Sequence, residues 1–121
     1  MRDSLLSDKS ILFAQKVVRL YRFLVESKDE TIISKQLLRS GTSIGANISE
    51  ADYAQSRIDF ISKLHIALKE TAETEYWLKL LNSSGYISKR DYEDLLNSCI
   101  EIKKILISSI NTAKSKLNNN Y

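Results

Sequence analysis

Few residues of this sequence could perform catalysis. His65 is the single histidine, and no serine or cysteine has a base at a recognisable spacing. Hydrolytic triads and cysteine–histidine pairs need such a base to activate the nucleophile. Di-iron bundles carry Glu-x-x-His on two helices, whereas Glu70 and Glu73 have no histidine beside them. We therefore expect no enzyme, no metal site and no cofactor, and we expect Cys99 to be a small core residue.

A polar stripe is predicted along one helix, from Gln36 through the segment RSGTSIGANISEA at 39–51. At about 100° per residue, its members project away from the apolar face, and Ser40 and Ala46 flank them. We expect an inter-helix hydrogen-bond network in which Arg39 meets a carboxylate such as Glu73, because these groups usually satisfy each other at packed helix surfaces. A ligand site is the alternative interpretation. The stripe consists of Gln36, Arg39, Ser43, Asn47 and Glu50.

Two glycines, Gly41 and Gly45, lie inside the same helix, where each costs about 1 kcal/mol relative to alanine. The segment GTSIG satisfies Gly-x-x-x-Gly, which indicates close helix packing. It lacks the lysine and hydroxyl residue of a phosphate-binding loop. We expect the small residues to let neighbouring helices approach closely on more than one side.

Basic residues collect on one arc of the first predicted helix. Lys16, Arg19 and Arg22 advance by three residues, and Lys9 lies one heptad earlier. A solvated outer face is one interpretation. The other is a contact with RNA or DNA, because a ring of copies would repeat the cluster and neutralise many phosphates together. No aromatic residues alternate with these cations, so such binding would be weakly sequence-specific.

Four amphipathic helices would position these residues. The chain has 121 residues, no proline and three glycines, which leaves few points at which a helix can break. Apolar residues recur at intervals of three and four, and the connections are short, so we expect an all-α, antiparallel, up-and-down four-helix bundle in one domain over 1–121. The predicted helices span roughly 9–27, 30–53, 57–83 and 89–117.

Local signals mark the ends of these helices. Asp29 or Thr31 is expected to cap the second helix. Ser56 and Ser88 each precede an aspartate by three residues, as in a capping box, and should start the third and fourth helices. Gly85 lies where a left-handed helix stop is expected.

Composition restricts the cellular setting. The formal net charge is +3, with acidic and basic residues interleaved, which permits nucleic-acid binding without requiring it. A single cysteine fits a reducing compartment. No apolar run approaches the ~20 residues of a membrane span. We expect a cytoplasmic protein without a membrane partner.

The third helix carries a second face, away from its Leu64–Leu68 stripe. A tryptophan on this face would be exposed in a monomer, and aromatic residues are enriched at interfaces. We therefore expect self-association. Glu75 falls near the core stripe, and its partner is not evident. The second face comprises Ile66, Glu70, Glu73 and Trp77.

Two segments, QLLRSGTSIGANISEA at 36–51 and ALKETAETEYWLKLL at 67–81, resemble the 23S rRNA-intervening sequence proteins, also called S23 ribosomal proteins. Two positions differ from the family pattern: Gly45 stands where many members have proline, and Ala51 stands where glycine is common. The matching residues are Gln36, Leu37, Arg39, Ser43, Ile44, Ala46, Asn47, Ile48 and Glu50 in the first segment, and Glu70, Trp77 and Leu78 in the second.

The resemblance implies a homopentameric barrel of antiparallel four-helix protomers. The family name describes the position of genes inside 23S rRNA genes and no activity. The accessory variability determinant proteins of diversity-generating retroelements are a related group that forms similar basic pentamers and binds a reverse transcriptase and nucleic acid. Two hypotheses follow for this chain: a non-enzymatic oligomer that binds RNA or DNA, or an adaptor that docks a protein such as a reverse transcriptase.

Overall fold

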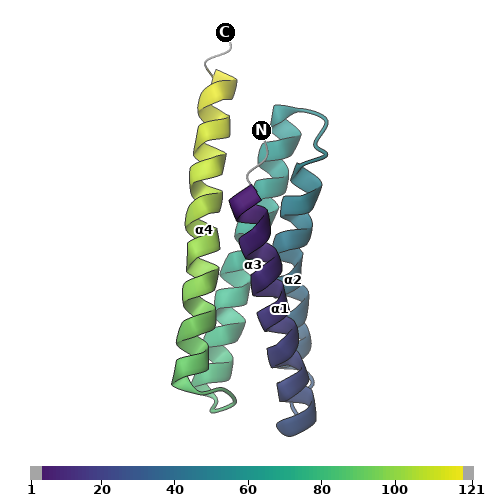
Figure 1. Ribbon diagram of the computed structural model, residues 1–121, viewed down its shortest axis with the longest axis vertical. Helices are drawn as coiled ribbons and strands as arrows, with labels where there is room; N and C mark the ends of the chain where they lie inside the picture. The colour runs from purple at the N-terminus through teal and green to yellow at the C-terminus, as the bar shows by residue number, and fades with distance from the viewer. Residues whose placement is uncertain (1–3, 119–121) are drawn as a thin grey trace.

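The computed structural model describes residues 4–118, which form four α-helices and, within that range, no strand. Helix α1 packs on α2, α2 on α3, α3 on α4, and α4 returns beside α1, so α1 and α3 lie on one diagonal (Figure 1). The up-and-down four-helix arrangement expected from the sequence is observed. The helices are α1 (Ser4–Ser27), α2 (Ile33–Ala51), α3 (Arg57–Ser83) and α4 (Lys89–Asn118).

Each helix contributes one apolar face to a shared core. Val17, Leu37, Leu78 and Leu106 are completely buried, as expected from residues that recur at three and four along each helix. Phe60 and Leu68 of the predicted stripes, together with Tyr21, are only partly buried at the edge of this core. None of the described helices is long and apolar enough to cross a membrane.

Helix α1 begins at Ser4, earlier than the predicted Lys9. Leu6 is buried and lies seven residues before Phe13, so the apolar face extends beyond the predicted start of the helix. At the other end, Asp29 has φ +55°, a left-handed conformation that stops helical geometry between α1 and α2.

Helix α2 is capped by Glu30, and the prediction of Asp29 or Thr31 as the cap was wrong. The Glu30 carboxylate accepts hydrogen bonds from the backbone N–H groups of Ile32, Ile33 and Ser34 at 3.1, 3.0 and 2.7 Å. These N–H groups have no partner inside the helix. The helix therefore starts at Ile33, later than the predicted Glu30.

The other end signals are confirmed. Ser56 Oγ accepts a hydrogen bond from the Asp59 backbone N–H, and Ser88 Oγ accepts one from the Asp91 N–H, both at 3.1 Å. Gly85 has φ +81°, the left-handed conformation that ends a helix and that glycine adopts without strain.

The small residues of α2 serve contacts inside this chain. A Cβ atom added to Gly41 would lie 2.9 Å from Cγ2 of Val17 in α1, and one added to Gly45 would lie 3.2 Å from Ser10 Oγ. The hydroxyl of Thr74 in α3 donates to Ser40 Oγ at 3.0 Å, and both side chains are completely buried. The prediction that Ser40 flanks the outer polar stripe was wrong, because its side chain is buried against α3.

Candidate functional site

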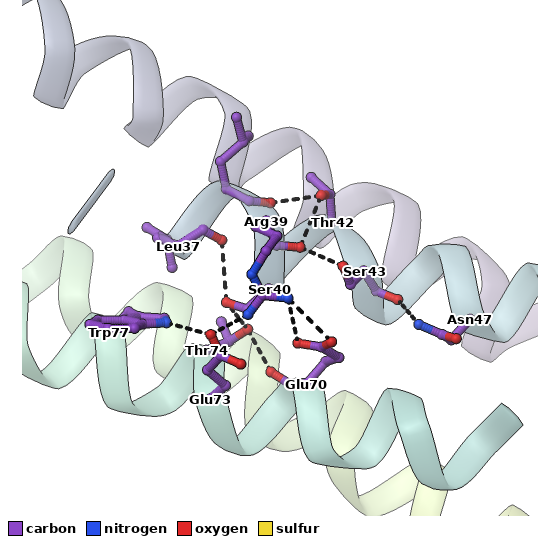
Figure 2. Close-up of polar contacts among 11 residues, drawn as sticks. Leu37, Arg39, Ser40, Thr42, Ser43, Asn47, Glu70, Glu73, Thr74 and Trp77 are labelled. Atoms are coloured by element: carbon purple, nitrogen blue, oxygen red, sulfur yellow. Dashed lines mark hydrogen bonds and ion pairs between the residues drawn. The ribbon is translucent and has the colours of Figure 1, made fainter. Parts of the chain in front are cut away.

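A charged network joins the outer edges of α2 and α3 (Figure 2). The Arg39 guanidinium forms an ion pair with Glu73, and its Nη1 lies 3.4 Å from Glu70 Oε2. The Trp77 indole N–H donates to the same Glu73 oxygen at 2.9 Å. The expected pairing of Arg39 with a carboxylate such as Glu73 is confirmed.

Three further residues of the α2 stripe, Ser43, Asn47 and Glu50, also form local contacts. Ser43 Oγ donates to the Arg39 carbonyl at 2.6 Å, and the Asn47 amide donates to the Ser43 carbonyl at 2.8 Å. Glu50 forms an ion pair with Lys63 of α3 at 3.1 Å, and Gln36 is exposed. A hydrogen-bond network therefore describes the stripe better than a ligand site.

Two of the four cations in the basic arc of α1 form ion pairs with α4. Lys9 forms an ion pair with Glu101 at 2.9 Å, and Lys16 with Asp94 at 3.1 Å. Arg19 and Arg22 are exposed. Arg19 borders a hollow that is also lined by Asp91 and Asp94.

The sequence contained a signal for these two ion pairs. Lys9 and Lys16 are seven residues apart, and so are Asp94 and Glu101. Two antiparallel helices with such a matched spacing can pair both ends at once. Both interpretations of the basic arc, as a solvated face and as a nucleic-acid contact, overlooked this matched spacing of lysines and carboxylates.

Two reactive groups close to the core, Glu75 and Cys99, have partners inside the bundle. Glu75 forms an ion pair with Lys103 of α4 at 2.9 Å, which supplies the partner that the sequence did not reveal. Burial, and then the negative charge of Glu75, raise the pKa of the Cys99 thiol to about 12, against a smaller effect of Lys103. Its Sγ donates to the Thr71 carbonyl at 3.6 Å, so Cys99 is a core residue. Within residues 4–118, no cluster of histidine, cysteine and acidic residues could hold a metal ion.

Most of the exposed large apolar side chains lie on α1 and α3, the two helices on one diagonal of the bundle. On the surface of α3, the exposed ring of Tyr76 packs edge-on against the half-buried Trp77, with ring centroids 4.9 Å apart. We call these the α1 face, formed by Leu5, Leu12 and Phe23, and the α3 face, formed by Ile58, Ile66 and Tyr76. Ile11 is also exposed but projects from another side of α1.

Comparison with known proteins identifies the family. Residues 2–108 match the family model described as 23S rRNA-intervening sequence protein. The chain belongs to this family. It is also similar to a protein of unknown function from the S23 ribosomal protein family of Bacteroides thetaiotaomicron VPI-5482, whose crystal structure superimposes with a TM-score of 0.90 at 58% identity. The match covers 92% of this chain and 99% of that chain. None of the curated proteins matches.

The residues that carry the family resemblance lie largely where α2 meets α3. Arg39 from the first segment meets Glu70 from the second, and Glu73 lies between Arg39 and Trp77. In this family member, the motif thus holds two helices in register.

Ionisation of Glu73 is coupled to this network. Hydrogen bonds from Arg39 and then from Trp77 hold the pKa of Glu73 below its ordinary value of 4.5, against the effect of burial. A carboxyl group with a lowered pKa stabilises the folded state above its unfolded pKa, and this contribution is lost as the pH falls through the folded pKa. The side chain of Arg39 is 49% exposed, so the ion pair contributes only about 0.2–1 kcal/mol.

Trp77 is the single tryptophan of the chain and can report this ionisation. We expect its fluorescence to titrate with a midpoint below pH 4.5, because protonation weakens Glu73 as an acceptor for the indole N–H. Arg39→Gln should raise the midpoint. Lys63→Gln removes a different cation between the same helices and should not change it. An equal midpoint in Arg39→Gln and the parent protein would contradict the coupling.

Proposed function

We propose that this family member is a non-enzymatic scaffold that assembles head to tail with copies of itself. The observation that carries the proposal is the pair of unlike apolar faces on diagonally opposed helices. A heterologous contact between two unlike surfaces generates a ring when the rotation closes. The family resemblance implies five copies per ring.

A protein partner suits the exposed chemistry better than a nucleic acid. Apolar and aromatic side chains are enriched in protein interfaces, and exposed ones also lie outside both assembly faces, at Tyr53 and Ile107. Lys9 and Lys16, two of the four cations of the basic arc, are already paired with carboxylates, and Arg19 lies beside acidic residues. Neutralisation of many phosphates would need free cations. We therefore propose that the ring docks proteins, with RNA or DNA binding as the weaker alternative.

Light scattering on the purified protein tests the assembly. We expect a mass near five protomers at both low and high salt, because contacts between apolar faces are not screened. Ile66→Arg should reduce this mass, since it places a charge in the α3 face. Ile32→Arg makes the same change at an exposed isoleucine between α1 and α2, outside both faces, and should leave the mass unchanged. A monomer at all concentrations would overturn the ring.

Titration with an RNA oligonucleotide separates the two binding hypotheses. Affinity that falls steeply with salt and is lost in the Arg19→Glu, Arg22→Glu double variant would favour nucleic-acid binding. A protein scaffold predicts weak RNA binding and a co-purifying protein that survives nuclease treatment. That protein should be lost when the ring is dissociated by Ile66→Arg.

A further inference from the structure

One end of the bundle has a cavity beside the first described residues of α1. The ion pairs of Lys9 with Glu101 and of Lys16 with Asp94 set the register and place Ser4 level with about Leu106 of α4. Helix α4 continues to Asn118, about three turns further. Figure 1 shows this end of α4 extending beyond the start of α1. Among residues 4–118, α1 contributes only Leu6 to the cavity lining.

The inner part of this cavity is apolar. Ile48, Phe60 and Leu64 line it together with Leu6, and its volume is about 410 Å³. Small-molecule sites commonly occupy 300–1,000 Å³ and are lined by apolar side chains with a few polar groups. The size and lining therefore fit a small molecule with an apolar portion.

The lining of the cavity also carries positive charge and hydroxyl groups. Arg57 from the start of α3 and Lys116 from the end of α4 line it, and neither forms an ion pair within the described part of the chain. Asp52, the acidic residue of the lining, is already engaged in an interaction. Ser108, Ser109 and Thr112 of α4 add hydroxyl groups to the lining. Guanidinium and ammonium groups bind carboxylates through strong, charge-assisted hydrogen bonds.

We propose that this end cavity binds a small amphipathic carboxylate, with its apolar chain against Phe60 and Leu64 and its carboxylate between Arg57 and Lys116. The site lies at the end of the bundle, and its lining contains no residue of the two apolar faces through which the proposed scaffold assembles. Its occupant is a free small molecule of the fatty-acid type.

Calorimetric titration of the full chain with decanoate, kept below its micelle concentration, tests the site. We expect one decanoate per protomer, and much weaker binding of decyltrimethylammonium, which has the same tail and the opposite charge. Arg57→Gln and Lys116→Gln should each weaken decanoate binding about tenfold, since each removes a charged hydrogen-bond donor. Lys114→Gln, an exposed residue of the same helix outside the lining, should not change it.

Methyl NMR places the ligand. We expect decanoate to shift the methyl resonances of Ile48 and Leu64 and to leave those of Leu24, outside the cavity lining, unchanged. Absence of decanoate binding, equal binding of both amphiphiles, or shifts confined to other residues would overturn the proposal. Binding to phosphatidylglycerol vesicles without binding to dispersed decanoate would also overturn it, because the site would then be a membrane contact.

Discussion

Replacement of Gly41 by leucine is expected to lower the free energy of unfolding by about 3 kcal/mol, the upper end of the usual cost of overpacking a core. A Cβ atom alone at this position would lie 2.9 and 3.0 Å from the two γ-carbons of Val17. Val17 is completely buried, so its side chain has no solvent-filled space to move into. The larger side chain must therefore push α1 away from α2. Chemical denaturation at one fixed protomer concentration measures the loss, because assembly would make stability depend on concentration.

Two comparisons isolate the steric cause. Ala46→Leu places the same side chain on the exposed surface of the same helix and should change stability by less than about 0.5 kcal/mol. Gly41→Ala gains about 1 kcal/mol of helix propensity, but its Cβ meets the same γ-carbons of Val17. We therefore expect it to destabilise the parent protein. In a Val17→Ala background these γ-carbons are absent, and Gly41→Ala should stabilise the protein. Parent-like stability of Gly41→Leu would mean that close approach of α1 and α2 does not require glycine.

Loss of the Glu30 carboxylate is expected to have the second largest effect. Glu30→Gln should destabilise the protein by about 1–2 kcal/mol at neutral pH, as removal of a helix cap does. The carboxylate accepts three backbone N–H groups at the start of α2, and the residue is buried. An amide has one acceptor oxygen and would leave part of this set without a partner.

The difference between Glu30→Gln and the parent protein should depend on pH. Burial opposes ionisation of Glu30, but hydrogen bonds from Ile33, Ser34 and Ile32 outweigh it and hold the pKa below its ordinary value of 4.5. The stabilisation is therefore complete above pH 4.5 and is lost as the pH falls through the lower, folded-state pKa. Unfolding curves at several pH values should converge at acidic pH. Parallel curves would contradict the capping role.

Asp29→Asn is the matched control for this charge. It removes an adjacent, exposed acidic residue that has φ +55°, a conformation that asparagine also tolerates. We expect a change below about 0.5 kcal/mol and no comparable pH dependence. An equal effect in both variants would indicate a general charge effect near the start of α2.

Much of the fold was predictable because its signals are local. Apolar residues at three and four predicted the four helices, and the capping interactions of Ser56 and Ser88 act within three residues of the cap. Gly85 ends α3 through its own backbone conformation. Each of these features depends on residues within about one helical turn, so the sequence window that contains the signal also contains its partner.

Two predictions were wrong, the cap of α2 and the exposure of Ser40, because a local sequence pattern does not show where a polar side chain folds. A glutamate at Glu30 reads as the first residue of a helix, but its side chain folds over the backbone N–H groups that follow it. Ser40 reads as a polar surface residue, but it is buried because Thr74 offers it a hydrogen bond. Polar residues are assigned to the surface by default, and only a packed neighbour reverses that assignment.

The sequence by itself determined the four helices, their apolar faces and the family motif. The tertiary structure alone decided which charges are paired, which glycine meets Val17 and which end of the bundle holds a cavity. Lys9 and Glu101 lie 92 residues apart in the chain. From the sequence alone, each lysine of α1 could have paired with any of several carboxylates on the other helices. The choice among them depends on the register between helices. Burial of apolar side chains from all four helices sets that register together, so it is a property of the assembled core and of no single segment.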